Sequence, residues 1–349
     1  MIKVHVNASR NYDICIADGI LNSSAELISH VKNKACKAAV ISDDKVFPLY
    51  GDTVVSGLKE KGFEVFTYVF ENGEKSKTLE TYCKIQGFLA KSKLTRTDII
   101  VALGGGVVGD VSGFCAATFL RGIEYVQIPT SLLAAVDSSV GGKTAVDMPE
   151  GKNLAGAFHQ PSIVICDTKC FDTLDATQFA SGFAEVIKYG VLCDKDLFEN
   201  LKTEKPYLPT LVERCVSIKR DVVASDEFDT GNRMFLNLGH TLGHAVERYS
   251  DFKLTHGAAV AVGMMMIAKI SEKYGYANTE ISDKLRQVLE KYSLPTEYDI
   301  PKEKLYELVC GDKKTSGKSI TLVMPTDIGK CELVKMPLEK LKTIIDETF

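Results

Sequence analysis

Short β-branched and aromatic runs alternate with helical stretches over the first half of the chain. The runs that resemble strands are KAAVIS, FEVFTYVF, DIIVAL, YVQIP and SIVICD. Strands that alternate with helices form parallel sheets, because each crossover helix packs on a face of the sheet. The pattern therefore predicts an α/β domain with a parallel sheet over residues 1–171.

From about residue 172 the apolar residues recur every three or four positions. Examples are ATQFASGFAEVIKYGVL, TLVERCVSIKRDVVASD and HGAAVAVGMMMIAKISEKYG. Near the C-terminus, SITLVMPTDIGKCELVKM has two strand-like runs around a turn. We therefore expect a second, mainly α-helical domain over residues 172–349, with a small hairpin near its end.

Composition and charge exclude several classes of protein. Of the 349 residues, 45% are hydrophobic and 25% are charged, which is typical of two globular domains. The net charge of −4 is spread over interspersed acids and bases, so neither nucleic-acid nor membrane-surface binding is predicted. No apolar run approaches the roughly 20 residues of a membrane span, and the N-terminus lacks a secretory pattern. We expect a cytoplasmic protein whose ten cysteines, with no CxxC pair, are reduced core thiols.

A glycine-rich loop follows the run DIIVAL. Gly104, Gly106 and Gly109 fit G-x-G-x-x-G, so backbone N–H groups at a helix N-terminus could hold a pyrophosphate. In the usual dinucleotide fold this loop closes the first βα unit, whereas here it comes after about 100 residues and the nearby acid, Glu124, precedes a strand. Asp43, at the end of AAVISD, is a better candidate for a ribose ligand. Tight turns and close packing are the alternative roles of these glycines.

The segment IPTSLLAAVDSSVGGKTAVD ends like a phosphate-binding P-loop. A Walker A loop requires glycine where this chain has Asp137, so a nucleoside triphosphatase is not favoured. The basic and polar side chains around this segment could instead form an anion pocket: Lys143, Lys152, Asn153 and Arg121. Solvated surface lysines are the alternative.

The stretch NLGHTLGHA contains two of the six histidines. On a helix His240 and His244 share a face, and His256 with a distant acid could complete a three-ligand metal site with an open position. A zinc protease of the HExxH type is excluded because threonine follows the first histidine. A hydrogen-bonded core histidine is the alternative, but Arg233 and Asn237 on the same helical run favour a site.

Six motifs, in order, resemble those of the 3-dehydroquinate synthases, which are sugar-phosphate cyclases. They are LGGGVVGDVSGFCAATFLRGI, DSSVGGKTAV, GKNLAGAFHQP, GFAEVIKYG, DEFDTGNRMFLNLGHTLGHAVE and LTHGAAVAVGM, and the resemblance runs from about residue 40 to 325. It implies an α/β NAD-binding domain, a helical metal- and substrate-binding domain, and an enzyme of the shikimate pathway, which leads to chorismate and the aromatic amino acids. This carbon–oxygen lyase would convert 3-deoxy-D-arabino-heptulosonate 7-phosphate to 3-dehydroquinate and phosphate. The steps would be transient oxidation by NAD⁺, phosphate elimination, reduction, ring opening and aldol closure.

The resemblance also implies which residues form the site. Zinc, which cobalt can often replace, would be bound by Glu185, His240 and His256, whereas His244 would face the substrate. NAD⁺ contacts would fall on Asp43, Glu74, Lys77, Gly105, Gly106, Asp110, Thr130, Ser131, Lys152 and Thr173. Substrate contacts would fall on Arg121, Asp137, Lys143, Asn153, Lys188, Lys219, Arg233, Asn237, His244 and either Lys313 or Lys314. Among these, His244 and Lys143 would handle hydroxyl protons and developing charge.

The family often has other residues at three positions of this chain: Asn at Lys45, Thr at Ser131 and Gln at Ala135. These departures bear on the ribose and nicotinamide contacts. The resemblance also implies a homodimer, with Arg121 reaching into the neighbouring site.

Three alternatives remain open from the sequence. A sister cyclase, making 2-deoxy-scyllo-inosose or a valiolone, would share fold, NAD⁺ and zinc. Arg233, Asn237 and the DSSVGGKT loop favour the dehydroquinate branch, whose substrate brings a carboxylate that Arg233 could pair. A glycerol-dehydrogenase-like oxidoreductase would release NADH and would not need the phosphate-binding lysines. A metal- and NAD-binding sensor without turnover would not need Lys143 and His244.

Overall fold

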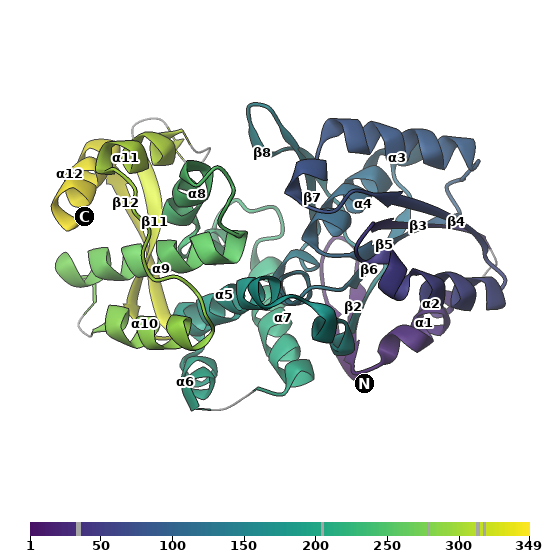
Figure 1. Ribbon diagram of the computed structural model, residues 1–349, viewed down its shortest axis with the longest axis horizontal. Coiled ribbons are helices and arrows are strands. Elements are labelled where there is room, and N and C mark those ends of the chain that lie inside the picture. The colour runs from purple at the N-terminus through teal and green to yellow at the C-terminus, as the bar shows by residue number, and fades with distance from the viewer. Residues whose placement is uncertain (33–35, 204–205, 278–279, 312–314, 317–318) are drawn as a thin grey trace. The chain divides into compact units, whose positions relative to one another are not determined.

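The computed structural model describes residues 1–32, 36–203, 206–277, 280–311, 315–316 and 319–349 (Figure 1). The chain forms two compact units. The first comprises Met1–Leu174 and Leu208–Phe228, and the second comprises Asp175–Tyr207 and Asp229–Phe349. Residues 208–228, which the helical pattern groups with the second domain, belong to the first unit because α7 (Leu208–Ser225) packs against its strands β1 and β2.

The first unit is built on a seven-stranded sheet. In spatial order its strands are β1 (Ile2–Val6), β2 (Tyr12–Ala17), β9 (Ile163–Asp167), β6 (Glu124–Pro129), β5 (Ile99–Gly104), β3 (Lys37–Asp43) and β4 (Glu64–Phe70). Neighbouring strands are parallel except β1 and β2, which are antiparallel. Every residue of β5 is buried, as expected for a central parallel strand covered on both faces. The predicted α/β fold is confirmed.

Helices cover both faces of this sheet (Figure 1). One face packs against α3 (Leu79–Lys91) and α4 (Gly106–Thr118), whose side chains share a core with Ile41 and Ile100. The helices α1 (Ser24–Val31) and α2 (Phe47–Glu60) lie on the other side. An antiparallel hairpin that the sequence did not predict, β7 (Lys143–Met148) and β8 (Gly151–Phe158), packs against α4.

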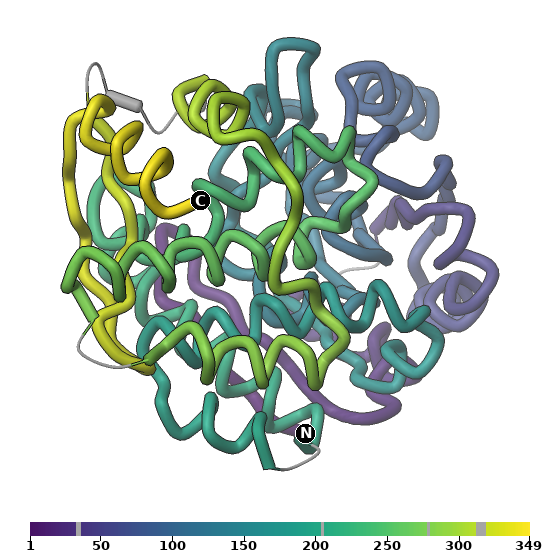
Figure 2. The backbone as a smooth tube through the Cα atoms, turned by 60° about the vertical axis from the view of Figure 1, so that its left-hand side comes forward, coloured from purple at the N-terminus to yellow at the C-terminus, as the bar shows by residue number. Residues whose placement is uncertain are grey.

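The second unit is mainly helical, as predicted. Its helices are α5 (Ala176–Cys193), α6 (Lys195–Thr203), α8 (His240–Tyr249), α9 (His256–Lys273), α10 (Ile281–Lys291), α11 (Lys302–Cys310) and α12 (Leu338–Thr348). The apolar helix α9 is buried on nearly all sides. It packs against α5, α8, α10 and β11, and Figure 2 traces the backbone of these elements. The predicted C-terminal hairpin is confirmed by β11 (Ser319–Asp327) and β12 (Lys330–Pro337), which join β10 (Thr315–Ser316) in an antiparallel sheet.

Short helical segments link several of these elements. They are η1 (Ile20–Ser23), η2 (Glu74–Ser76), η3 (Phe119–Arg121), the π-helix η4 (Ala134–Ser138), η5 (Thr168–Thr173) and η6 (Asn232–Asn237). Among the residues described, no helix combines the length and the apolar character needed to span a bilayer.

Candidate metal and nucleotide sites

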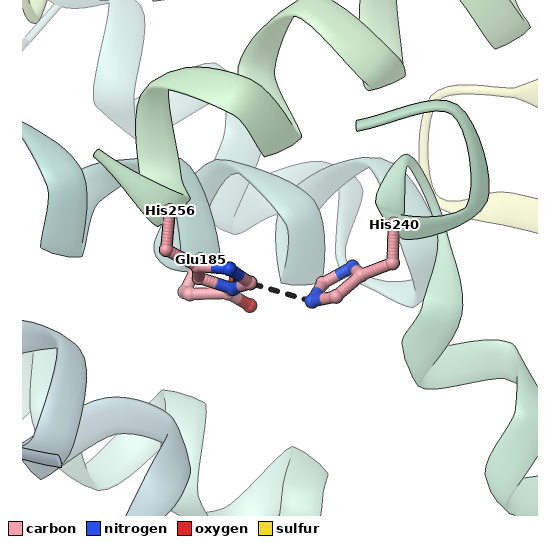
Figure 3. A group of neighbouring side chains, drawn as sticks. All are labelled: Glu185, His240 and His256. Atoms are coloured by element: carbon pink, nitrogen blue, oxygen red, sulfur yellow. Dashed lines mark ion pairs between the residues drawn. The ribbon is translucent and has the colours of Figure 1, made fainter. Parts of the chain in front are cut away.

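Three potential metal ligands converge in the second unit. Glu185 lies in the middle of α5, His240 is the first residue of α8, and His256 is the first residue of α9. The Oε1 atom of Glu185 lies 3.5 Å from His240 Nε2 and 3.4 Å from His256 Nε2 (Figure 3). A single carboxylate oxygen therefore faces two imidazole nitrogens.

This spacing fits a tetrahedral metal ion. With bonds of about 2.0–2.2 Å, donor atoms of a tetrahedral zinc site lie about 3.3–3.6 Å from one another. The separations of Glu185 Oε1 from the two Nε2 atoms fall in that range. One carboxylate and two imidazoles leave a coordination position for water or substrate, which is typical of catalytic rather than structural zinc.

The orientation of His240 selects its metal-facing nitrogen. Its Nδ1 atom lies 3.0 Å from the carbonyl oxygen of Leu238. A carbonyl oxygen only accepts, so Nδ1 carries the hydrogen and Nε2 keeps its lone pair toward Glu185. Burial lowers the pKa of His240 well below its usual range, and the charge of Lys188 lowers it further, so the ring is neutral, as a metal ligand must be.

His256 lies between two carboxylates. Its Nε2 atom faces Glu185, and its Nδ1 atom lies 3.8 Å from Oε2 of Glu247, a residue of α8. Burial lowers the pKa of His256, but hydrogen bonds and charge from these two carboxylates outweigh burial and raise it to about 9. A cation that replaces this proton would find the same carboxylates already in position.

Lys188 and His244 complete the surroundings of the three ligands. Lys188, one turn after Glu185 on α5, is buried and forms an ion pair with Oε2 of Glu185, which leaves Oε1 toward the histidines. The ring of His244 lies 5.3 Å from that of His240 and 5.7 Å from that of His256, centroid to centroid.

Local backbone signals place the two ligand histidines at helix starts. Gly239 has φ of 75°, a left-handed conformation that favours glycine, and α8 begins at the next residue. The side chain of Thr255 caps α9 by accepting the N–H of Ala258 at 3.3 Å. Because of the turn at Gly239, Arg233 and Asn237 lie on the separate segment η6, so the prediction that they share a helical run with the histidines is wrong.

The predicted nucleotide residues of the first unit lie at the carboxyl ends of adjacent strands. From β3 the chain passes to β4 on one side and then to β5 on the other, so the strand order reverses between β3 and β5. Asp43 ends β3, Gly105 and Gly106 follow β5, and the N–H of Thr130 after β6 donates to Gly104 at 3.0 Å. A crevice at such a reversal is where open α/β sheets bind nucleotides.

The glycine-rich loop supplies backbone donors and close packing. Gly105 is extended and caps α4, so the first N–H groups of this helix point toward the carboxyl edge of the sheet. A Cβ atom on Gly109 would lie 3.0 Å from Oε1 of Gln127 on β6. The last glycine of the motif therefore allows α4 to approach the sheet.

A buried lysine joins predicted NAD⁺ and substrate residues. Lys77 Nζ lies 2.6 Å from Asp110 Oδ2 and donates to Asn153 Oδ1, also at 2.6 Å. Burial lowers the pKa of Lys77, but nearby carboxylates, above all Asp110, outweigh burial and raise it, so Lys77 is charged. The backbone N–H of Asn153 donates to Asp147 Oδ1 at 2.7 Å, which holds the left-handed turn at Asn153 (φ 54°).

Two further ion pairs adjoin this group, since Glu74 acts electrostatically on Lys77, and both Glu74 and Lys219 act on Asp110. Lys219 on α7 pairs with Asp137, with Nζ 3.0 Å from Oδ2 and 2.7 Å from the backbone oxygen. Lys152 pairs with Glu74 at 3.0 Å. Thr173 is bonded to the Tyr50 hydroxyl at 2.7 Å, and Lys143 is the first residue of β7.

Comparisons with known proteins assign this architecture to a family. The family description "3-dehydroquinate synthase N-terminal" matches residues 67–181, and "3-dehydroquinate synthase C-terminal" matches residues 182–315. The chain belongs to the 3-dehydroquinate synthase family. The resemblance inferred from the motifs is thereby confirmed.

Individual 3-dehydroquinate synthases match over nearly their whole length. The protein of that name from Clostridium acetobutylicum is 46% identical over 334 residues, 93% of this chain and 94% of its own. The one from Streptococcus gordonii is 42% identical over 354 residues, 99% of each chain. A crystal structure of 2-deoxy-scyllo-inosose synthase complexed with carbaglucose-6-phosphate, NAD⁺ and Co²⁺ superposes with a TM-score of 0.88 at 26% identity, covering all of both chains.

Three residues expected from the 3-dehydroquinate synthase resemblance are not among the groups described above. Lys313 and Lys314 lie outside the described residues. Arg121 precedes β6, so it lies at the edge of the sheet opposite the glycine-rich loop.

The departures at Lys45 and Ser131 leave the local hydrogen bonds in place. Asp43 Oδ1 accepts the backbone N–H groups of Lys45 and Val46 at 3.0 and 2.9 Å, and an asparagine at 45 would offer the same N–H. The hydroxyl of Ser131 accepts the N–H of Ala134 at 3.3 Å, as threonine could. Ala135 is buried.

Two carboxylates that contact predicted site residues, Asp147 and Glu247, were not predicted from the sequence. Each lies close along the chain to a predicted site residue, six residues before Asn153 and three after His244. Helical spacing from His244 was a usable signal for Glu247.

Proposed function

We propose that the protein is a 3-dehydroquinate synthase, a carbon–oxygen lyase that converts 3-deoxy-D-arabino-heptulosonate 7-phosphate to 3-dehydroquinate and phosphate. The observation that carries this proposal is 46% identity to the Clostridium acetobutylicum enzyme over nearly the whole of both chains. The group formed by Glu185, His240 and His256 supports it, because its spacing suits a catalytic metal.

The protein would bind one zinc or cobalt ion and one NAD⁺. Glu185, His240 and His256 would hold the metal, and the carboxyl edge of the first unit's sheet would hold NAD⁺. When bound, the metal supplies a Lewis acid for substrate hydroxyl oxygens and NAD⁺ supplies a reversible hydride acceptor. The reaction as a whole changes no redox state, so NAD⁺ would be needed without being consumed.

In the first unit, the side chains would bind the cofactor and the phosphate group. The Asp43 carboxylate would accept hydrogen bonds from ribose hydroxyls, and the N–H groups of Gly105 and Gly106 would donate to the pyrophosphate. Lys143 and Asn153 would contact the sugar phosphate, and Lys77 would keep the Asn153 amide oriented.

In the second unit, the polar side chains around the metal ligands would position the substrate and move protons. Lys188 would fix the Glu185 carboxylate and donate toward substrate oxygens. His244, beside both ligand histidines, would take and return a hydroxyl proton. Arg233, 2% exposed, would pair with the substrate carboxylate, because a guanidinium binds a carboxylate with two hydrogen bonds.

We further propose a homodimer in which Arg121 serves the partner's site. Arg121 precedes β6 and Asp137 follows it, and a strand of six residues spans about 20 Å. Within one chain, these two side chains therefore lie at opposite edges of the sheet, too far apart to contact the same small substrate.

Mixing two inactive variants tests this arrangement. Arg121→Ala and Lys143→Ala homodimers should each lack activity, but a one-to-one mixture that exchanges subunits should recover about a quarter of wild-type activity, since each hybrid has one intact site. No recovery despite confirmed exchange would place Arg121 in its own subunit's site.

A sister sugar-phosphate cyclase is the second candidate function. It is favoured by the fold similarity to 2-deoxy-scyllo-inosose synthase, at a TM-score of 0.88. The lower identity to that protein, 26% against 46%, favours 3-dehydroquinate synthase.

The deciding experiment measures phosphate and 3-dehydroquinate from 3-deoxy-D-arabino-heptulosonate 7-phosphate, with NAD⁺ and zinc each supplied or withheld. We expect product only when both are present, no accumulation of NADH, and no product from Glu185→Gln. Product from glucose 6-phosphate or sedoheptulose 7-phosphate instead would identify a sister cyclase. Net NADH formation with a polyol would identify a dehydrogenase.

A further inference from the structure

We infer that Glu247 is a positioning residue for the metal site: its carboxylate holds Nδ1 of His256, so that Nε2 of the same ring faces the metal. This inference rests on the metal site of the proposed function. It adds a residue that does not itself bind the ion but orients one that does.

The geometry of His256 carries the inference. Its two ring nitrogens face carboxylates on opposite sides, Nε2 at 3.4 Å from Glu185 and Nδ1 at 3.8 Å from Glu247. Glu185 and Glu247 are 1% and 4% exposed, so water solvates neither well. A buried carboxylate is costly unless it is hydrogen-bonded or paired, and the ion pair with His256 is one such contact for Glu247.

The placement of Glu247 follows from helix geometry. It lies seven residues after His240 on α8, and two helical turns bring both residues to the same face. The helix α8 thus supplies one ligand from its first residue and supports a second ligand from its last turn.

The two helices are close enough for this contact because small residues line their interface. A Cβ atom on Gly243 would lie 2.7 Å from the carbonyl oxygen of Ala259, and one on Gly263 would lie 2.0 Å from that of Gly239. The Glu247 carboxylate therefore reaches His256 at the start of α9.

The two ligand histidines are oriented by different acceptors. His240 donates from Nδ1 to the Leu238 carbonyl, whereas His256 faces a carboxylate. A carboxylate on the remote nitrogen fixes the tautomer and makes the metal-facing nitrogen more basic, and removing such a partner typically lowers metal affinity about 10–100-fold.

Glu247 also belongs to a second group with ligand spacing, together with His244 and His256. If Glu247 were a metal ligand, the ion would bind Nδ1 of His256 beside Glu247, instead of Nε2 beside Glu185. The 3.8 Å separation of Glu247 from His256 exceeds the donor spacing of a tetrahedral zinc site, about 3.3–3.6 Å, whereas the Glu185 contacts fit it. The geometry therefore favours Glu185 as the ligand.

The test compares metal binding by Glu247→Ala, Glu247→Gln and Glu185→Gln after the metal has been removed. Zinc affinity is measured by competition with a chelator, and the visible spectrum of the cobalt-loaded protein reports the ligand field. The matched control is Glu272→Gln on α9, because the Glu272 carboxylate accepts from Ser282 at 2.6 and 2.7 Å, far along the helix from His256. Circular dichroism verifies that each variant is folded.

We expect Glu247→Ala to bind zinc about 10–100-fold more weakly than wild type and to show an altered cobalt spectrum. Glu247→Gln, which keeps an acceptor oxygen, should recover part of that loss, and Glu272→Gln should match wild type within twofold. Should Glu247→Ala not fold, the comparison of Glu247→Gln with Glu272→Gln decides.

Two results would overturn the inference. Affinity within twofold of wild type and an unchanged cobalt spectrum in the Glu247 variants would show that the carboxylate does not act on His256. Loss of the metal from Glu247→Gln as complete as from Glu185→Gln would make Glu247 a ligand. These measurements need no substrate, so a wild-type protein that binds zinc as expected but forms no 3-dehydroquinate would refute only the proposed function.

Discussion

Gly257 lies directly against the backbone of Ser181. Its N–H donates to Ser181 Oγ at 3.1 Å, and a Cβ atom on residue 257 would lie 2.2 Å from the carbonyl oxygen of Ser181. Gly257 follows His256, and Ser181 lies one helical turn before Glu185. The absence of a side chain at position 257 therefore sets the distance between two metal ligands.

Gly257→Ala should push the start of α9 away from α5. We expect zinc affinity to fall at least about tenfold, since one ligand moves out of reach, and stability to fall by about 1–3 kcal/mol from overpacking. Zinc competition and thermal unfolding measure the two effects. The control is Gly87→Ala on α3, where nothing lies within 4 Å of the added Cβ atom and a small stabilisation is expected. Unchanged zinc affinity in Gly257→Ala would contradict this account.

Asp43→Asn should weaken NAD⁺ binding without disturbing the turn after β3. Asparagine keeps the oxygen that accepts the N–H groups of Lys45 and Val46, so the turn after β3 should persist. The loss of charge should weaken NAD⁺ binding about tenfold, as expected when one charge-assisted hydrogen bond is reduced to a neutral one. Calorimetric titration with NAD⁺ checks this, and zinc affinity should not change. Equal NAD⁺ affinity in wild type and variant would remove Asp43 from the cofactor site.

Arg233→Ala should weaken substrate binding about 10–100-fold, because hydrogen bonds between charged groups contribute about 1.5–3 kcal/mol. NAD⁺ affinity should stay within twofold. The comparison variant is Arg220→Ala, since Arg220 forms a surface pair with Asp221 that adds little to stability or binding. Binding of a substrate analogue and of NAD⁺ is measured separately for each protein. Equal losses for both ligands would argue against a carboxylate contact.

His159 should make stability depend on pH. Burial lowers the pKa of His159, which bonds through Nε2 to the Ile123 carbonyl and stacks on Tyr125 at 5.3 Å, with the charge of Arg10 nearby. Because the folded pKa lies below the unfolded value of about 6.5, protonation favours unfolding, and this contribution is present above pH 6.5 and lost as pH falls below it. Between pH 7.5 and 5.5, the free energy of unfolding of wild type should therefore fall by more than that of His159→Gln.

Denaturant unfolding at the two pH values measures this difference. Glutamine keeps an N–H donor for Ile123, so the two proteins should have similar stability at pH 7.5. Parallel pH profiles for wild type and variant would show that His159 does not titrate in this range.

The parallel sheet and the start of α4 could be predicted from the sequence. DIIVAL followed by three glycines determines a buried strand, a turn and a helix locally, because a continuous apolar run and glycine's backbone freedom act over a few residues. The packing position of α7 could not be predicted from local sequence. Its apolar periodicity shows that one face is buried but not which strands bury it, and the partners β1 and β2 are 190 or more residues distant.

For the site, the sequence indicated the metal group but not its support. His240 and His256 stood out because histidine is rare in the chain, and Glu185 came only from the family resemblance. Glu247 has the composition of an exposed helix residue, and only the tight packing of α8 on α9 brings it to His256. Arg233 and Asn237 were misplaced because Gly239, in the left-handed region, interrupts what reads as one continuous helix.

The discontinuity of the first unit has a consequence for biosynthesis. When residues 1–174 have been synthesised, every strand of the large sheet has been made. The helix that packs on β1 and β2, α7, is still missing, because it follows α5 and α6 in the chain. Glu185 is synthesised in that interval, before the first unit can close, and His256 emerges after it. Strands β1 and β2 therefore stay partly uncovered until residue 228 has been made, and Glu185 stays without its partner ligands for longer. Neither unit can finish folding as an independent N-terminal or C-terminal half of the chain.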